Sequence, residues 1–333
     1  MSAHRYPVGI IGAGAWGTAL AAVMADLHGR ALIWAREPAL AAAINDIHEN
    51  GTYLTGIPLS PNIRATPDLA DMAQCEILLI VVPAQFLRAT LSLLPDSISA
   101  AVPLVLCAKG LEAGTQALMA EVAAAVRPEN PVAILSGPTF AHEVAARMPT
   151  AITLACEDEA MGEKLVQTIA APHFRPYWTN DVTGAEIGGA VKNVLAIACG
   201  VVDGAGLGLN ARAALIARGF AEMQRYGLAR NARAETLAGL SGLGDLVLTC
   251  SSENSRNFSF GRGLGQGTSA QILLANRKTV AEGAATAPVL LKSAQILGVD
   301  MPIVASVCQL LEGGTDVGAV IHALLSRPLR AER

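Results

Sequence analysis

The chain has 333 residues, of which 52% are hydrophobic and 16% are charged. This length corresponds to about two domains, and the apolar content excludes an intrinsically disordered chain. The net charge of −4 at pH 7 shows no basic excess, which argues against nucleic acid as a partner.

The first apolar segment, residues 8–25, carries no charge and therefore resembles a signal peptide or a membrane span. Four glycines interrupt it, at Gly9, Gly12, Gly14 and Gly17. A membrane-spanning helix needs about 20 predominantly apolar residues, so this segment is too short and too rich in glycine. We expect neither a targeting sequence nor membrane insertion, and we expect a cytoplasmic protein.

Short β-like runs alternate with longer helical patterns in the first half of the chain. The strands predicted are Val8–Ile11, Ala31–Trp34, Ile77–Val82, Leu104–Cys107, Val132–Leu135 and Ala151–Leu154. Helical spacing marks Ala39–His48, Gln85–Leu94, Thr115–Val126 and Met161–Ala170. Strands that are apolar on both faces and alternate with helices predict an α/β domain of the Rossmann type, with a doubly wound, mostly parallel sheet.

The second half of the chain has a helical pattern. Helices are predicted at Gly184–Val202, Ala211–Tyr226, Arg233–Leu240 and Ala287–Leu297, and no convincing strand follows Asp181. We therefore predict a dinucleotide-binding Rossmann domain over residues 1–181 and an all-α substrate and catalytic domain over residues 182–333. The glycine-rich run Gly261–Gly267 is interpreted as a helix end or a mobile loop.

Six cysteines lie far apart in the sequence, without a C-x-x-C pair or clustered histidines. Spacing of this kind favours buried, reduced thiols in a cytoplasmic protein over disulfides or a zinc site. We therefore expect no metal ion in this protein.

A G-x-G-x-x-G motif, formed by Gly12, Gly14 and Gly17, lies between the first predicted strand and a helix that starts near Ala15. Its glycines permit a tight turn, a close approach of the backbone to a pyrophosphate, and close packing of helix on strand. The helix directs N–H groups and the positive end of its dipole at the phosphates. The motif alone is weak evidence, but its place in a βαβ pattern predicts a dinucleotide site.

The end of the second predicted strand bears on the choice between NAD and NADP. A site for NAD usually carries Asp or Glu there, which binds the ribose 2′-hydroxyl. This chain has Arg36, whose guanidinium suits a 2′-phosphate and can stack on adenine. Because Glu37 follows directly, NAD stays open. We favour NADP, with NAD as the second choice.

Lys192 is the candidate general acid and base for hydride transfer to a carbonyl. It lies in the apolar segment Gly188–Gly200, and an isolated ammonium in a core is costly unless it has a special role. On a helix, its face is shared by the small residues Ala185, Gly188, Gly189 and Ala196. These leave room for another backbone or a ligand. The alternative is a lysine that extends to the surface from an amphipathic helix.

Three further polar clusters are candidates for substrate binding. Lys109 and the run Ser136–Ala141 each follow a predicted strand, at the edge where α/β folds bind ligands. Arg256 and Asn257 offer donors suited to a phosphate, and Asp245 could accept a substrate hydroxyl or orient a lysine. An ordinary turn or a solvated loop is the alternative interpretation of each cluster.

Seven segments form a pattern that is distinctive in its order and spacing. They are Ile11–Leu20, Ala108–Glu112, Leu135–Ala141, Gly189–Val194, Gly242–Cys250, Ser255–Asn257 and Val280–Gly283. With them the chain resembles the bacterial-type NAD(P)-dependent glycerol-3-phosphate dehydrogenases over nearly its whole length. Taken singly, only the segments around Lys192 and Asp245 are distinctive.

The resemblance implies an active site between a Rossmann domain and a helical domain, with Lys192 as proton donor and acceptor. The substrate contacts that it implies are Lys109, Gly137, Thr139, Lys192, Asp245, Ser255, Arg256 and Asn257. The coenzyme contacts that it implies, besides Gly12, Gly14 and Gly17 of the motif, are Ala15, Trp16, Arg36, Lys109, Ala141, Arg256, Val280 and Glu282. Ala15 departs from the Ser or Asn that is frequent in the family, which a backbone contact would tolerate.

The resemblance also implies the reaction: dihydroxyacetone phosphate, a small phosphorylated three-carbon substrate, is reduced to sn-glycerol 3-phosphate for glycerophospholipid synthesis. Two alternatives stay open. One is a β-hydroxyacid or 6-phosphogluconate-type dehydrogenase, against which Arg256 and Asn257 argue. The other is a non-enzymatic redox sensor that binds NADPH, which leaves Lys192 unexplained. The sequence is compatible with a homodimer.

Overall fold

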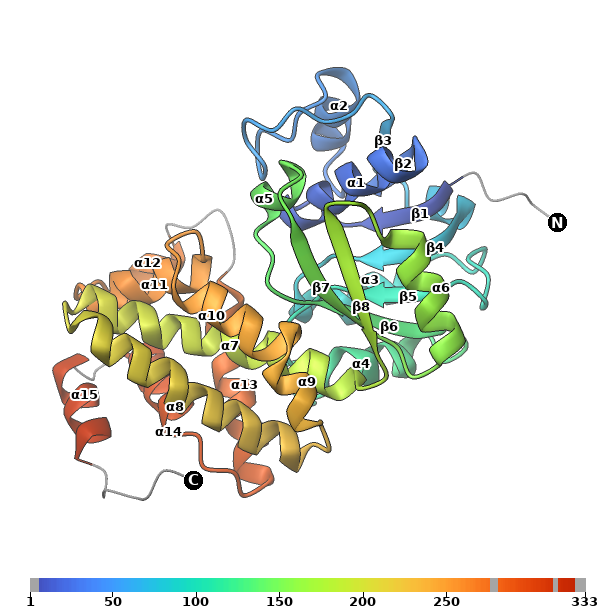
Figure 1. Ribbon diagram of the computed structural model, residues 1–333. Helices are drawn as coiled ribbons and strands as arrows, with labels where there is room; N and C mark the ends of the chain where they lie inside the picture. Colours follow the sequence, from blue (N-terminus) through green and yellow to red (C-terminus); the bar gives the residue numbers. More distant parts are fainter. Residues whose placement is uncertain (1–5, 276–280, 314–316, 327–333) are drawn as a thin grey trace. The chain divides into compact units, whose positions relative to one another are not determined.

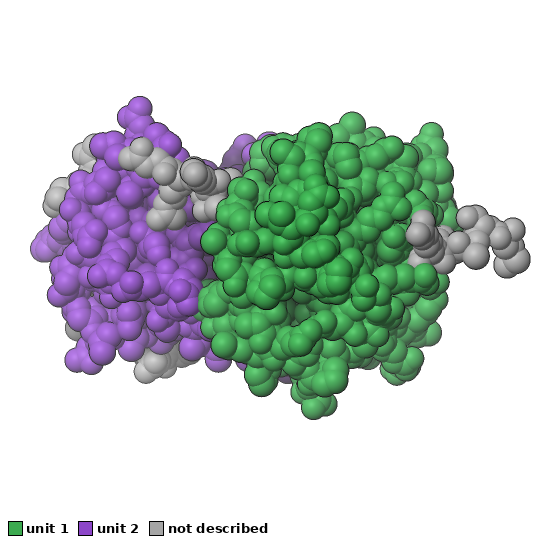
Figure 2. Space-filling view, turned by 90° about the horizontal axis from the view of Figure 1, so that it is seen from above, with its two compact units in different colours: residues 1–109, 117–186 green, residues 110–116, 187–333 purple. Residues whose placement is uncertain are grey.

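The computed structural model of the chain describes residues 6–275, 281–313 and 317–326. The chain divides into two compact units, drawn in green and purple in Figure 2. Unit 1 contains Met1–Lys109 and Ala117–Glu186, and unit 2 contains Gly110–Gln116 and Ile187–Arg333. The sequence patterns do not indicate that the short segment Gly110–Gln116 belongs with unit 2. The predicted domain boundary at residue 182 stays a prediction.

Unit 1 is built on one eight-stranded sheet with the strand order β3-β2-β1-β4-β5-β6-β7-β8. The strands are β1 (Tyr6–Ile11), β2 (Ala31–Trp34), β3 (Ile63–Thr66), β4 (Cys75–Ile80), β5 (Leu104–Leu106), β6 (Val132–Ser136), β7 (Thr150–Ala155) and β8 (Phe174–Thr179). Neighbouring strands run parallel, except that β6 and β7 are antiparallel. The predicted doubly wound, mostly parallel sheet is therefore confirmed.

Helices cover both faces of this sheet (Figure 1). They are α1 (Ala15–His28), α2 (Pro38–Asp46), α3 (Leu87–Ser92), α4 (Met119–Val126), α5 (Ala141–Ala145) and α6 (Glu159–Ile169). Successive residues of a strand point to opposite faces, so β4 supplies Ile77 and Leu79 to the core under α1, α5 and α6. It supplies Leu78 and Ile80 to the core under α3 and α4. Burial on both faces explains why these strands are apolar throughout.

Two strands of the sheet were not predicted from the sequence, β3 and β8, and both lie at its edges. β8 contains Pro176, and proline within a run argues against a central strand but is tolerated at an edge. β3 has only four residues and includes the exposed Arg64. An edge strand is paired on one side only, so it needs less of the apolar pattern on which the prediction relied.

Unit 2 is helical, and its described residues contain no strand. Its α-helices, the first of which begins in unit 1, are α7 (Val182–Gly204), α8 (Gly208–Ala229), α9 (Ala234–Ala238), α10 (Asp245–Cys250), α11 (Arg256–Gly265), α12 (Ala270–Ala275), α13 (Glu282–Ile296), α14 (Pro302–Glu312) and α15 (Val317–Leu325). A π-helical turn, η3 (Leu240–Gly244), precedes α10. The prediction of an all-α second half is confirmed.

Helix α7 is the long apolar helix of this half. Within the described residues, it is the one helix long and apolar enough to cross a membrane by length and composition, and its apolar window is entirely buried inside the protein. Burial of this kind is typical of a helix at the centre of a domain core. The residues near its middle, Val194, Leu195 and Ile197, are fully buried.

Helices α7 and α11 pack against each other through glycines. A Cβ atom on Gly261 would lie 1.9 Å from the carbonyl oxygen of Ile197, and a Cβ atom on Gly200 would lie 2.1 Å from that of Phe258. Only glycine lets the two backbones approach this closely. Of the two interpretations of Gly261–Gly267, the helix end is confirmed, because α11 ends within this run at Gly265. Glycine has a weak helix propensity, so the sequence does not indicate that the packing of α11 on α7 requires these glycines.

Candidate active site

The glycine-rich loop joins β1 to α1 in unit 1. Gly12 has φ +117°, and a Cβ atom there would lie 2.3 Å from the carbonyl oxygen of Val81. Gly14 is the N-cap of α1 and, as glycine, offers no side chain to the first turn. A Cβ atom on Gly14 would meet nothing within 4 Å, so the start of α1 is open around this residue. The first N–H groups of a helix have no intrahelical partner. This loop fits a pyrophosphate.

The other residues of this helix start are Ala15, Trp16 and Gly17. Ala15 is the first residue of α1, so its backbone N–H is one of those that a helix start leaves without an intrahelical partner. Trp16 packs its ring against the core of unit 1, with its centroid 6.4 Å from that of Phe174. A Cβ atom on Gly17 would lie 1.8 Å from the carbonyl oxygen of Gly12. Gly17 thus lets the helix start close to the strand, as the motif predicts.

Arg36 lies just after β2, where the sequence places a coenzyme-selecting residue. Its Nε and Nη2 atoms donate hydrogen bonds of 3.0 Å and 2.7 Å to Oε1 of Glu37. The hydrogen bond and the charge of Glu37 raise the pKa of Arg36. The two side chains are 75% and 47% exposed, and such surface ion pairs contribute little stability. A phosphate could therefore compete with Glu37 for this guanidinium.

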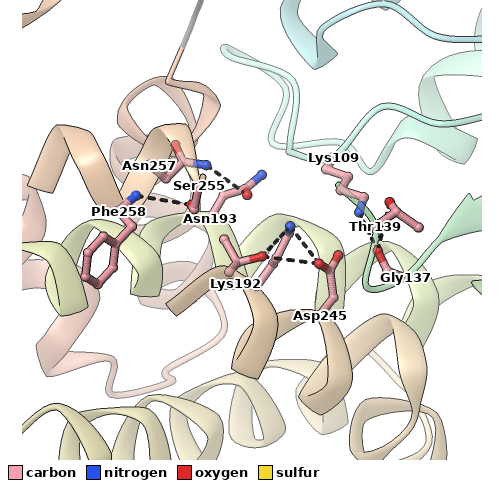
Figure 3. Close-up of polar contacts among 10 residues, drawn as sticks. Lys109, Gly137, Thr139, Lys192, Asn193, Asp245, Ser255, Asn257 and Phe258 are labelled. Atoms are coloured by element: carbon pink, nitrogen blue, oxygen red, sulfur yellow. Dashed lines mark hydrogen bonds and ion pairs between the residues drawn. The ribbon is translucent and has the colours of Figure 1, made fainter. Parts of the chain in front are cut away.

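Lys109, Gly137 and Thr139 come together at the carboxyl ends of β5 and β6 (Figure 3). Nζ of Lys109 and Oγ1 of Thr139 both donate to the carbonyl oxygen of Gly137, at 3.2 Å and 3.4 Å. A Cβ atom on Gly137 would lie 3.0 Å from Cγ1 of Ile152, so a larger residue would crowd β7. Ala141 follows as the first residue of α5. The structure therefore brings together three of the predicted substrate contacts, Lys109, Gly137 and Thr139.

The cysteine nearest to this group in sequence is Cys107. Burial raises the pKa of its thiol to about 12, so it stays protonated and is a poor nucleophile at neutral pH. All six cysteines are buried and free of disulfides, in agreement with the expected reduced thiols.

Lys192 lies on α7 in unit 2 and is 7% exposed. Its Nζ atom donates to Oδ1 of Asp245 at 2.9 Å and to Oγ1 of Thr249 at 2.8 Å. The Thr249 hydroxyl in turn donates to the same Asp245 oxygen at 3.2 Å. This hydrogen-bonded triangle is drawn in Figure 3. The structure thus contradicts the alternative interpretation of Lys192 as a surface lysine.

Glycine and the π-helical turn position Asp245 beside Lys192. A Cβ atom on Gly188 would lie 2.4 Å from the carbonyl oxygen of Ser241, so the small face of α7 admits the backbone of η3, as expected. The turn closes with a hydrogen bond of 3.0 Å from Gly244 N to Gly239 O, a spacing of five residues. Asp245 then begins α10.

Thr249 is part of this arrangement, although we predict no role for it from the sequence. It follows Asp245 by four residues on α10, so both side chains lie on one face of the helix. A threonine four residues after an aspartate on a helix places a hydroxyl beside a carboxylate. This spacing is the signal from which the role of Thr249 could have been predicted.

A second polar cluster joins α7, α11 and α13. Asn257 Nδ2 donates to Asn193 Oδ1 at 2.9 Å, and the backbone N–H of Gly283 donates to Asn257 Oδ1 at 3.0 Å. Ser255 caps α11 by accepting from Phe258 N at 3.2 Å. Ser255 and Asn257 are both buried, so each has a structural role beside the predicted one.

The remaining predicted residues lie at helix starts. Arg256 is exposed and is the first residue of α11, and Glu282 is the first residue of α13. Val280 lies outside the described residues.

Sequence and structure comparisons agree with this architecture. Residues 7–162 match the model of the NAD-dependent glycerol-3-phosphate dehydrogenase N-terminus, and residues 181–322 match that of its C-terminus. The chain belongs to the NAD-dependent glycerol-3-phosphate dehydrogenase family. The predicted family and fold class are confirmed.

Members of this family from several bacteria are close relatives. The chain is 59% identical over 324 residues to glycerol-3-phosphate dehydrogenase (NAD(P)+) 1 of Sphingopyxis alaskensis, covering 97% of each chain. It is 58% identical over 325 residues to glycerol-3-phosphate dehydrogenase (NAD(P)+) of Erythrobacter litoralis, covering 98% of this chain and 97% of the relative. The crystal structure of glycerol-3-phosphate dehydrogenase from Coxiella burnetii has a TM-score of 0.92 at 36% identity, covering 97% of this chain and 99% of that one.

Proposed function

We propose that this chain interconverts dihydroxyacetone phosphate and sn-glycerol 3-phosphate with NADPH or NADH, and that Lys192 exchanges the proton. The observation that carries the proposal is the buried triangle of Lys192, Asp245 and Thr249 in a chain of this dehydrogenase family. The family membership sets aside the redox sensor and the β-hydroxyacid or 6-phosphogluconate-type dehydrogenase.

Most of the proposed coenzyme contacts lie in unit 1. The bound coenzyme supplies a hydride to the substrate carbonyl carbon. The loop Gly12–Gly17 binds its pyrophosphate through backbone N–H groups, and Arg36 binds the 2′-phosphate of NADP. NAD lacks that phosphate, but Glu37 can accept a hydrogen bond from its ribose hydroxyl. We therefore propose that both coenzymes are used and that NADP is preferred. The other proposed coenzyme contacts are Lys109, Ala141, Arg256, Val280 and Glu282.

Lys192 acts as general acid in the reduction and as general base in the reverse direction. Its ammonium donates a proton to the carbonyl oxygen as negative charge develops there. Asp245 holds the ammonium in place through the 2.9 Å hydrogen bond and offsets its charge, which burial would otherwise penalise. Thr249 fixes the direction of the side chain by accepting a second hydrogen bond from Nζ.

The phosphate of the substrate is held by donors near the start of α11. Arg256 is an exposed residue there, and its guanidinium can form paired hydrogen bonds with phosphate oxygens. Asn257 adds an amide donor, and the positive end of the helix dipole favours an anion. The other proposed substrate contacts are Lys109, Gly137, Thr139 and Ser255. A three-carbon ketone is too small to be oriented without such an anchor.

The product, sn-glycerol 3-phosphate, supplies glycerophospholipid synthesis in this proposal. We also propose a cytoplasmic location and assembly as a homodimer, both of which are predictions from the sequence.

A spectrophotometric assay tests the proposal. Purified full-length chain is mixed with NADPH or NADH and with dihydroxyacetone phosphate, and coenzyme oxidation is followed. We expect turnover with both coenzymes. In parallel, 3-hydroxy acids are offered together with NADP+ or NAD+. Turnover on the hydroxy acids and none on dihydroxyacetone phosphate would contradict the proposal.

A further inference from the structure

Asn50 lies outside the glycine motif in sequence but contacts its loop. It is fully buried, at 0% exposure. Its Nδ2 atom donates to the carbonyl oxygen of Ala13 at 2.9 Å and to Oγ1 of Thr18 at 2.8 Å. Its Oδ1 atom accepts from the backbone N–H of Tyr53 at 3.0 Å. One side chain thus connects the loop, the first turn of α1 and the segment after α2.

The bond to Ala13 determines how the next peptide group is oriented. The Ala13 carbonyl and the Gly14 N–H belong to one planar trans peptide, so they point in opposite directions. Asn50 holds this carbonyl toward the buried side of the loop. The Gly14 N–H is therefore aimed away from Asn50. The surroundings of Gly14 are open, since a Cβ atom there would meet nothing within 4 Å.

We infer that Asn50 is a positioning residue that aims the Gly14 N–H at the coenzyme pyrophosphate. This inference rests on the proposed function, which places a dinucleotide at the loop. An N–H group that is already oriented stabilises the bound phosphate more than one that must be ordered during binding. Asn50 itself stays buried behind the loop and touches no ligand.

The segment that carries Asn50 is itself held at both ends. Glu49 forms a β-bridge with Pro58, and the backbone N–H of Leu59 donates to His48 O at 2.8 Å. Leu54 N donates to the Asn50 carbonyl oxygen at 2.9 Å. Because this segment is closed, the Asn50 amide is fixed before any ligand binds.

Replacement of Asn50 by alanine tests the inference. Two hydrogen bonds to the loop and α1 are lost, so we expect the Kd of NADPH to rise about tenfold. The Kd of NADH should rise by the same factor, since both coenzymes carry the pyrophosphate. The KM for coenzyme should rise with Kd, whereas kcat and the KM for dihydroxyacetone phosphate should stay near their wild-type values. Binding is followed by titration of the full chain with NADPH.

Asn130→Ala is the matched control. Asn130 is also buried, and its Nδ2 atom donates to the carbonyl oxygens of Ser99 and Val102, which precede β5. It therefore lies toward the amino ends of the strands, away from the glycine loop. We expect Asn130→Ala to lower the thermal stability about as much as Asn50→Ala and to leave the Kd of NADPH unchanged.

Thr18→Val provides a second variant in case Asn50→Ala does not fold. It removes the hydroxyl that accepts from the Asn50 amide and that itself donates to the Ala13 carbonyl at 3.4 Å. The 2.9 Å bond from Asn50 to Ala13 is kept, so we expect a smaller rise in Kd, about two- to threefold. A wild-type Kd in the folded Asn50→Ala protein, or in Thr18→Val where that alone folds, would overturn the inference. So would an equal loss of binding in Asn130→Ala. Wild-type NADPH binding without turnover of dihydroxyacetone phosphate would instead refute the proposed reaction.

Discussion

The ion pair of Lys192 and Asp245 is almost completely buried, with side-chain exposures of 9% and 1%. Removing two charges from water costs free energy that their attraction often fails to offset, so such pairs are weak contributors to stability. The Thr249 hydroxyl adds a neutral partner to both charged groups. The proposed proton-transfer role would explain why a buried charge pair joins the apolar helix α7 to α10.

Coenzyme preference is expected to depend on Arg36. In Arg36→Asp the charge-assisted hydrogen bonds to the 2′-phosphate are lost and a carboxylate repels it, while that carboxylate can accept from the ribose hydroxyl of NADH. We predict that the kcat/KM ratio of NADPH to NADH falls about 10- to 100-fold. The control is Arg147→Asp, which breaks another exposed pair, with Asp26. An unchanged ratio in Arg36→Asp would refute the phosphate contact.

The sequence predicts some of these residues better than others. Lys192 is conspicuous because a charge interrupts an apolar helix, and Gly12 because its spacing from Gly14 is a known pattern. Asn50 gives no such signal. Its hydrogen bonds join it to Ala13 and Thr18, more than thirty residues away, and one sequence does not reveal which distant backbone carbonyl an asparagine meets.

At the scale of elements, the central strands are predictable because both faces are buried and the residues are therefore apolar throughout. The edge strands β3 and β8 are less so, because they need less apolar character and tolerate Arg64 and Pro176. Helix α11 is the opposite case: its glycines predict a poor helix, but the contact with α7 requires them. Local propensity is a weak guide wherever tertiary packing decides.

The crossing of α7 and α11 is expected to be intolerant of added volume. In Gly261→Ala the new methyl group would lie 1.9 Å from a backbone oxygen of α7, which a side-chain rotation cannot relieve. We predict a loss of about 1–3 kcal/mol in the free energy of unfolding. The bond between Asn193 and Asn257 spans these helices, so the KM for dihydroxyacetone phosphate should rise as well.

Gly263→Ala is the control on the same helix. The added Cβ atom would meet the end of the Leu273 side chain, 2.7 Å from Cδ2, which can move. Denaturant unfolding of both variants measures the difference, and equal stability of Gly261→Ala and wild type would refute the account of this contact.

At the scale of the whole molecule, the pH dependence of stability is expected to reflect Glu222. This residue of α8 is 1% exposed and accepts from the backbone N–H groups of Ile303 and Val304 at the start of α14, at 2.8 Å and 3.3 Å. Burial raises its pKa from 4.5 to about 7, although the two backbone hydrogen bonds and Arg225 act in the opposite direction. Asp300 adds to the rise.

The direction in which stability changes with pH follows from proton binding. Between pH 4.5 and about 7 the folded state keeps a proton that the unfolded state has lost, so stability falls as pH rises. We predict that Glu222 lowers the free energy of unfolding by up to about 1.4 kcal/mol for each unit by which the pH rises in this window. Glu222→Gln cannot titrate and should remove this contribution. Denaturant unfolding at several pH values compares the two proteins, and identical slopes would contradict the prediction.

The central claim is that Lys192 transfers the proton, and the most direct test is steady-state reduction of dihydroxyacetone phosphate by Lys192→Ala, with NADPH binding measured on the same sample. Lys292→Ala, which removes an exposed lysine from α13, is the control. We predict that kcat falls about 10²- to 10⁴-fold in Lys192→Ala alone, while the Kd of NADPH stays at its wild-type value. A near-normal kcat in Lys192→Ala would contradict the claim.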